Sequence, residues 1–224
     1  MTDSEKERSI KAALEDFAQG KPVKMVSLGK KGIYFDGQVV RDCTCILEGA
    51  DPHSIRELQS GLVHADKNYV WESGGHIVPL ADGPTFKTFG GIDGIYAKDK
   101  FHVYCKGDYG RYISIEGADP KTFKALDFAY AKDSKRIYSS GKVLEDVGSQ
   151  YTIDQCGFLK GEKAVYHYTF RLPVDASSFK VMNLDEKLKD TNPFLGKFQI
   201  SDLNGTYLYI AEGGSSGRRF ISPM

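Results

Sequence analysis

A nine-residue segment occurs twice in this chain in nearly the same form. The copies are Tyr96-Ala-Lys-Asp-Lys-Phe-His-Val-Tyr104 and Tyr130-Ala-Lys-Asp-Ser-Lys-Arg-Ile-Tyr138, and they begin 34 residues apart. Self-similarity at a spacing of this order is the signature of repeat proteins, in which one small structural unit is copied and stacked. This spacing restricts the possible folds more than any other property of the sequence.

The pattern within these copies continues along most of the chain. An aromatic residue follows a β-branched one at six positions, and a turn residue stands five positions before each. The aromatic residues are Tyr34, Trp71, Tyr104, Tyr138, Tyr166 and Tyr207, and the turn residues are Asp66, Asp99, Asp133 and Asp202, with Gly29 and Gly161 in the other two copies. β-branched and aromatic residues favour strands, whereas Asp and Gly favour turns. A glycine turn after most of the aromatic residues then predicts a three-stranded meander in each unit.

The connections between units also share a sequence. Gly49-Ala-Asp-Pro52 and Gly117-Ala-Asp-Pro120 are identical, and degenerate copies follow other units. Asp before Pro favours the start of a helix, because Asp accepts bonds from the first-turn N–H groups and Pro loses none there. Phe123 and Leu126 would then lie on one side of a single helical turn. Each connection is therefore predicted to be a short helical corner.

Residues 1–20 have the pattern of an amphipathic helix. Ser4 and Glu7 have the spacing of a capping box, and Gly20 followed by Pro22 is typical of a helix end. The expected apolar stripe consists of Ile10, Leu14 and Phe17. We expect this helix to cover one open end of the repeats, because a terminal unit lacks a neighbour on one side.

Together these patterns predict a mainly β fold of tandem three-stranded meander repeats with short helical corners in a solenoid-like array. A closed β-propeller is the alternative, although about 34 residues is short for a four-stranded blade. We expect one continuous domain with an N-terminal helical cap at 1–22, repeats at 23–182, and an insertion with a degenerate terminal repeat and tail at 183–224. The tail glycines predict mobility there.

The charge balance argues against some functions. Thirty Lys and Arg residues balance thirty Asp and Glu residues, so the chain lacks the basic surface on which nucleic-acid binding depends. No apolar run reaches the roughly 18 residues of a membrane span. The N-terminal residues are acidic where a signal peptide is basic. We therefore expect a cytoplasmic protein, unless a leader has been removed.

Candidate metal-binding and catalytic residues are few. Cys43 and Cys45 would share one strand face, but a structural zinc takes four ligands and no second close pair of Cys or His follows. One aspartate per turn cannot supply the roughly six or more oxygens that calcium takes. The five histidines are scattered, and no familiar catalytic motif occurs. The sequence predicts no catalytic residue, no metal and no cofactor.

The repeats resemble a known family. The nonamers, together with Glu116-Gly-Ala-Asp-Pro-Lys-Thr-Phe123, are similar to the bacterial DKNYY repeats, a motif that Asp66-Lys-Asn-Tyr-Val70 nearly spells. The resemblance covers 24–182 well and 198–210 weakly. It implies tandem repeats in bacterial proteins of largely unassigned role, and it brings no catalytic residue to this chain.

One hairpin carries the best candidates for an interface. Lys106–Tyr112 contains Asp108, Tyr109, Arg111 and Tyr112, which are residue types suited to contacts with a partner. The alternative interpretation is that the two tyrosines cover their own strands.

Repeats without catalytic motifs favour a non-enzymatic module that binds another protein. Its most concrete form is a bacterial immunity protein that neutralises a toxin, which rests on analogy. Two alternatives stay open: a glycan- or envelope-binding module, and an enzyme such as a hydrolase with its site between repeats. The sequence fixes neither the partner nor the oligomeric state.

Overall fold

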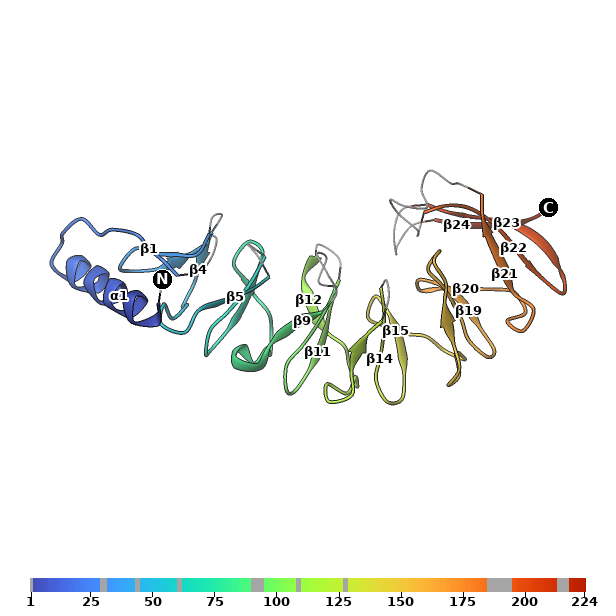
Figure 1. The fold of residues 1–224 in the computed structure, drawn as a ribbon, viewed down its shortest axis with the longest axis horizontal. Coiled ribbons are helices and arrows are strands. Elements are labelled where there is room, and N and C mark those ends of the chain that lie inside the picture. Colours follow the sequence, from blue (N-terminus) through green and yellow to red (C-terminus); the bar gives the residue numbers. More distant parts are fainter. Residues whose placement is uncertain are drawn as a thin grey trace. The chain divides into compact units, whose positions relative to one another are not determined.

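The computed structural model describes residues 2–28, 32–42, 45–59, 62–89, 95–107, 110–126, 129–184, 195–212 and 218–224. Within them the chain forms one α-helix and six antiparallel sheets of four strands each (Figure 1). The chain divides into two compact units, Met1–Lys121 (unit 1) and Thr122–Met224 (unit 2). The predicted mainly β fold of tandem meanders is confirmed.

Unit 1 contains the helix and three sheets, which we call A, B and C. In each sheet four short strands follow one another along the chain, and each pairs antiparallel with the next. The strands are β1 (Val26–Ser27), β2 (Tyr34–Phe35), β3 (Val40–Arg41) and β4 (Ile46–Leu47) in sheet A, β5 (Arg56–Gln59), β6 (Val63–Ala65), β7 (Val70–Glu72) and β8 (His76–Ile77) in sheet B, and β9 (Lys87–Phe89), β10 (Tyr96–Lys98), β11 (Val103–Lys106) and β12 (Tyr112–Ser114) in sheet C.

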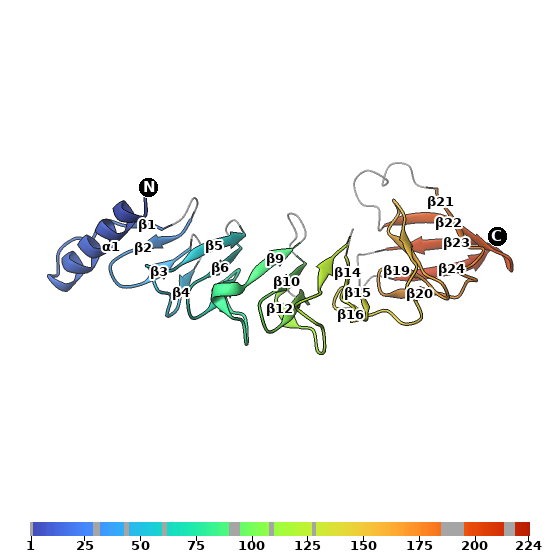
Figure 2. The same cartoon turned by 60° about the horizontal axis from the view of Figure 1, so that its bottom comes forward.

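Unit 2 contains sheets D, E and F on the same plan. The strands of sheet F are the longest, and Figure 2 shows all four of them side by side. The strands are β13 (Lys124–Ala125), β14 (Tyr130–Lys132), β15 (Ile137–Ser139) and β16 (Lys142–Val143) in sheet D, β17 (Thr152–Ile153), β18 (Phe158–Lys160), β19 (Val165–His167) and β20 (Phe170–Leu172) in sheet E, and β21 (Lys180–Asn183), β22 (Gly196–Asp202), β23 (Gly205–Ala211) and β24 (Arg219–Pro223) in sheet F.

Each sheet has one more strand than the sequence pattern predicted. In sheets B to F the extra strand is the first one, and it comes from the connection that was expected to be a helical corner. In sheet D, Lys124 pairs with Lys132 and Ala125 with Ala131. Phe123 is buried while Lys124 is exposed, so the connection alternates with the period of a strand. Among the described connections between sheets, Gly83–Thr85 forms a helical turn, of the 3₁₀ type.

Helix α1 (Asp3–Ala18) covers sheet A, as predicted for a cap, but its details differ. Thr2 and Glu5 form the capping box two residues earlier than expected. Ile10 and Ala13 are buried, whereas Leu14 and Phe17 are 41% and 46% exposed. The buried stripe runs through Ala13 because the helix lies very close to the β2–β3 turn. A Cβ at Gly37 in that turn would lie 2.7 Å from the Ala13 carbonyl oxygen. No helix in the described part of the chain is long and apolar enough to cross a membrane.

The repeat aromatic residues lie in the core of the four middle sheets. Trp71, Tyr104, Tyr138 and Tyr166 are buried, and so are the β-branched residues before them. In sheets A and F the predicted Tyr34 and Tyr207 are only half-buried, and the core positions belong to Phe35 and Tyr209. The six positions are therefore equivalent in the middle of the array and shifted along the strand in the first and last sheets.

Two predicted segments fall largely outside the described residues. Residues 185–194 of the insertion and 213–217 of the tail are not among them. The end of the tail is not a mobile segment, because Arg219–Pro223 forms β24 and pairs with β23 over its whole length.

Candidate functional site

The repeat aspartates Asp66, Asp99, Asp133 and Asp202, which we call the turn carboxylates, stand between the second and third strands of sheets B, C, D and F. In each, Oδ1 accepts hydrogen bonds from two backbone N–H groups of the same turn, at 2.6–3.2 Å. Asp is favoured there because its side chain replaces the backbone acceptors that a tight turn leaves out.

The second oxygen of the turn carboxylate binds the connection that precedes its sheet. In sheets B, C and F, Oδ2 accepts the N–H of another aspartate at 2.6–2.8 Å. These donors, which we call the connection aspartates, are Asp51, Asp82 and Asp175. One carboxylate thus holds together a turn and the chain that enters the same sheet.

The repeat tyrosine uses the same oxygen in two sheets. Tyr104 donates its hydroxyl hydrogen to Asp99 Oδ2 at 2.9 Å, and Tyr138 donates to Asp133 Oδ2 at 2.6 Å. Both rings are buried, so each hydroxyl needs an acceptor inside the protein. The five-residue spacing between Asp and Tyr in the repeat follows from this contact. Burial, together with the bond to Asp99, raises the pKa of Tyr104 far above its ordinary value.

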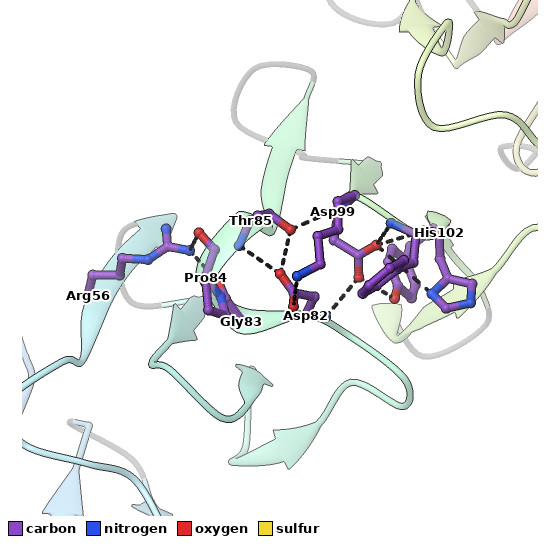
Figure 3. A network of polar contacts seen from close by, with 10 residues as sticks. Arg56, Asp82, Gly83, Pro84, Thr85, Asp99 and His102 are labelled. Carbon is purple, nitrogen blue, oxygen red and sulfur yellow. Dashed lines mark hydrogen bonds and ion pairs between the residues drawn. The ribbon is translucent and has the colours of Figure 1, made fainter.

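The connection aspartate has a network of its own, which Figure 3 shows for sheet C. Asp82 Oδ2 accepts the Thr85 hydroxyl at 2.6 Å, and its Oδ1 lies 3.0 Å from the ammonium of Lys100. Thr85 Oγ1 in turn accepts the backbone N–H of Lys100 at 3.1 Å. Arg56 from the preceding sheet donates to the carbonyl of Gly83. Each connection is therefore fixed from both sides.

Sheet B repeats this arrangement with different residues. Asp51 accepts from the Ser54 hydroxyl at 2.7 Å and lies 3.0 Å from the Lys67 ammonium. Burial alone would raise the pKa of Asp51, but the bonds from Ser54 and Lys67 outweigh it and lower the pKa to about 2. The Asp-Lys pair that begins the motif thus has two structural roles: its Asp binds the turn, and its Lys pairs with the connection.

In sheet E the turn is bound to its connection without an aspartate. Gly161 takes that position, and a Cβ there would lie 2.2 Å from the Val147 carbonyl oxygen. Glu162 donates its N–H to that oxygen at 2.8 Å. Its side-chain Oε1 accepts the N–H groups of Ser149 and Gln150, both at 2.9 Å. Glu162 therefore takes the role of the turn carboxylate, and the connection lies directly against the backbone of the turn.

The hairpin predicted to bind a partner is only partly described. Asp108 and Tyr109 lie outside the described residues. Arg111 is exposed, and its guanidinium lies 3.0 Å from His76 Nε2 of sheet B. Tyr112 is 2% exposed and belongs to the core of sheets B and C. Tyr112 therefore covers its own strand, which corrects its assignment to a partner surface.

Exposed apolar residues occur instead on the fourth strand of all six sheets. They are 36–59% exposed, with Ile46 on β4 and Phe220 on β24 in the first and last sheets. We call those of sheets B to E the edge-strand residues: Ile77 on β8, Ile113 on β12, Val143 on β16 and Phe170 on β20. A signal for two of them was present in the sequence, because Ile77-Val78 and Val143-Leu144 each place two apolar residues side by side on a strand. Only Val78 and Leu144 face the core.

Unit 2 also contains a polar groove of about 570 Å³ beside the turn of sheet D. One wall consists of the turn, with Lys132, Lys135 and Arg136; the other consists of the connection to sheet E, with Val143 and Tyr151. This volume is within the range of roughly 300–1,000 Å³ found for ligand pockets. The sequence analysis did not predict this groove.

The buried histidines are packed rather than poised for proton transfer. His167 is stacked on Phe158 with ring centroids 4.4 Å apart, and its Nδ1 lies 3.0 Å from the Tyr209 hydroxyl. Burial, assisted by the charge of Arg219, lowers the pKa of His167 to about 3. In the described part of the chain, no three His, Cys, Asp or Glu side chains are placed to hold a metal ion.

Comparison with known proteins gives one match. The model of the DKNYY family matches residues 96–212, which is more than half of the chain. No curated protein and no solved structure matches the chain. The matched range includes the turn carboxylates Asp99, Asp133 and Asp202, and the chain belongs to the DKNYY family.

Proposed function

We propose that this chain is a non-enzymatic protein-binding module that acts in the bacterial cytoplasm, with an immunity protein that neutralises a toxin as its concrete form. The observation that carries the proposal is the set of edge-strand residues. Each of them exposes an apolar side chain on the fourth strand of its sheet, in unit 1 (Ile77, Ile113) and in unit 2 (Val143, Phe170). Ile77 and Val143 pair with the repeat aromatic residue of the third strand, whereas Ile113 and Phe170 pair with the residue after it.

The repeat has one set of residues that holds the scaffold together and another that is exposed, and this separation supports the proposal. The recurring polar residues are bonded within the scaffold, as Asp99 is to its turn, its connection and Tyr104. The edge-strand residues vary in type: Ile in sheets B and C, Val in sheet D and Phe in sheet E. Within one unit, side chains displayed by neighbouring repeats can form an extended binding surface, as in other repeat proteins. Exposed apolar residues with a polar surround are typical of protein interfaces.

The test is a growth-protection assay with the protein encoded beside this chain in its genome. We expect that protein alone to arrest growth, and co-expression of this chain to restore growth through a complex that copurifies in fixed stoichiometry. If the two proteins neither bind nor protect, the proposal is wrong.

Two variants locate the surface. Ile77→Asp and Ile113→Asp place a charge in the proposed interface, and each should weaken the complex about tenfold or more, as residues central to an interface do. Leu203→Asp is the matched control, because Leu203 is 70% exposed but lies in the turn of sheet F. Equal losses from all three variants would contradict the assignment to the edge strands. Thermal unfolding of each variant establishes that it is folded.

A further inference from the structure

Three lysines at corresponding places of successive repeats have different surroundings. Lys98, Lys132 and Lys160 each end the second strand of a sheet. The ammonium of Lys98 donates to the Pro120 carbonyl at 2.8 Å, and that of Lys160 donates to the Ser177 carbonyl at 3.3 Å. Both lysines are thus bound to the connection that follows their sheet. Among the described residues Lys132 has no such bond, and its ammonium lies 5.5 Å from the centre of the Tyr151 ring.

The reason is the position of the connection after sheet D. It is bound forward to the turn of sheet E, through the contact between Val147 and Gly161 and the bonds that Ser149 and Gln150 make to Glu162. After sheet B the connection lies against the turn of its own sheet, since a Cβ at Gly83 would lie 2.2 Å from the Asp66 carbonyl oxygen. Because the connection after sheet D is bound to sheet E instead, a groove is open beside Lys132.

The walls of this groove differ in charge. Lys132, Lys135 and Arg136 stand on the side of the turn, together with Asp133, whose carboxylate accepts bonds from its own turn and from the Tyr138 hydroxyl. Glu145 and Asp146 are on the other side, where Asp146 is paired with Arg171 at 2.9 Å. A single carboxylate fits beside the cations, whereas a polyanion would also approach the two acidic residues and be repelled.

We propose that this groove binds one Asp or Glu side chain of a protein partner, with Lys132 and Arg136 as the residues that hold its carboxylate. The inference rests on the proposed function and names the partner chemistry for unit 2. Val143, an edge-strand residue, lines the same groove, so an exposed apolar side chain adjoins the charged site. Arg binds carboxylates with two parallel N–H bonds, and Lys supplies a point charge.

A short dye-labelled peptide in which one Glu stands between Leu and Ser residues is the probe, and fluorescence anisotropy with the full chain is the measurement. Lys132→Met and Arg136→Gln should each weaken binding about tenfold, because each removes a hydrogen bond to a charged group. Lys142→Met is the matched control, because Lys142 is exposed on β16 but does not line the groove. The same peptide with Gln in place of Glu should bind about tenfold more weakly than the Glu peptide.

Three results would overturn the inference: no binding of the Glu peptide, equal binding of the Gln peptide, or equal losses from Lys132→Met and Lys142→Met. Competition by inorganic phosphate at the strength of the peptide would overturn it as well, since the site would then bind anions without regard to a peptide. Growth protection in the same cells separates the two proposals. If protection depends on Ile77 and Ile113 but not on Lys132 and Arg136, the proposed function stands and this inference fails.

Discussion

The turns of sheets C and E close in the same way but are bound to their connections by different residues. In both, the first residue of the turn donates its N–H to the carbonyl three positions on, at 3.0 Å from Asp99 and 2.9 Å from Gly161. Asp99 then binds the connection through its side chain, at 2.8 Å from the Asp82 nitrogen. Gly161 instead lies directly against the Val147 carbonyl, and Glu162 supplies the carboxylate.

This difference teaches that the repeat needs a carboxylate at the junction of turn and connection rather than an aspartate at one position. The N–H groups at the junction must be paired wherever they are removed from water. Asp meets that need from within the turn, and Glu162 meets it from one residue further along. This exchange has a consequence, because the connection that Glu162 binds also leaves Lys132 uncovered and opens the groove.

Removal of the Asp99 side chain should have the largest effect. Asp99→Ala leaves the N–H groups of Phe101, His102 and Asp82 and the hydroxyl of Tyr104 without their acceptor. Asp99 is 4% exposed, so water replaces these bonds poorly, and we expect a loss of about 3 kcal/mol in the free energy of unfolding. Urea unfolding followed by circular dichroism measures it.

Two control variants sharpen this result. Asp99→Asn keeps one acceptor oxygen for the turn and should lose less than Asp99→Ala. Asp146→Asn removes the charge of an exposed aspartate that is paired with Arg171. Asn tolerates the positive φ of 58° at this position, so the variant should change stability by at most about 0.5 kcal/mol. If Asp99→Ala cost no more than Asp146→Asn, the turn carboxylate would not hold the repeat together.

The second prediction tests whether the two turns are interchangeable. Gly161→Asp with Glu162→Lys writes the Asp-Lys motif into sheet E, and sequence similarity alone would suggest a stabilised repeat. The structure predicts the opposite, a loss of about 2 kcal/mol from overpacking, because a Cβ at position 161 meets the Val147 carbonyl oxygen at 2.2 Å. Thermal or urea unfolding measures the change.

Gly83→Ala provides the comparison for that variant, since its Cβ would meet the Asp66 carbonyl oxygen at the same 2.2 Å. Neither glycine has a positive φ, so both variants test steric contact rather than backbone strain. Stabilisation of the double variant would mean that the connection after sheet D can return to the position it has after sheet B.

The sequence was sufficient to predict the repeat and its fold class. The spacing of Tyr104 and Tyr138 from their aspartates reflects a direct hydrogen bond, so a pattern of residues corresponded to a physical contact. The first strand of sheets B to F was not predicted, because Asp-Pro before Phe123 and Leu126 suits a helical turn as well as a turn followed by a strand. Pairing with β14 decides between them, and pairing is not a local property.

The candidate site was predicted less well than the fold. Tyr112 belongs to a residue type common at interfaces, but its ring fills the core between sheets B and C. The groove depends on the displacement of a connection by Glu162, which stands where sheets B and C have the motif lysine. The only sign of the groove in the sequence was Gly161, which stands in place of the repeat aspartate. It indicates that sheet E departs from the repeat, but it does not indicate where the connection lies.

The third prediction concerns pH and compares His167 with a variant that does not titrate. His167 has its pKa lowered to about 3 by burial and then by Arg219, whereas an unfolded histidine titrates near its ordinary value of about 6.5. The unfolded state therefore binds more protons below that pH, and stability falls as the pH is lowered. One proton gives a loss of about 1 kcal/mol between pH 6 and pH 5. His167→Gln should remove this part of the pH dependence; an unchanged slope would show that His167 is not buried as a neutral ring.

The smallest effect is expected from Glu162→Ala. Its carboxylate is exposed, and water can replace it at the N–H groups of Ser149 and Gln150, so the loss in stability should be well below that of Asp99→Ala. The bonds from Gln150 and then Ser149 lower the pKa of Glu162 below its ordinary 4.5. Its stabilisation is thus present above pH 4.5 and is lost as the pH falls through the lowered pKa, where the wild type and the variant should unfold at the same urea concentration. If Glu162→Ala instead cost as much as Asp99→Ala at neutral pH, the two carboxylates would be equal supports of their repeats, and the exposed junction of sheet E would be no weaker than the buried junction of sheet C.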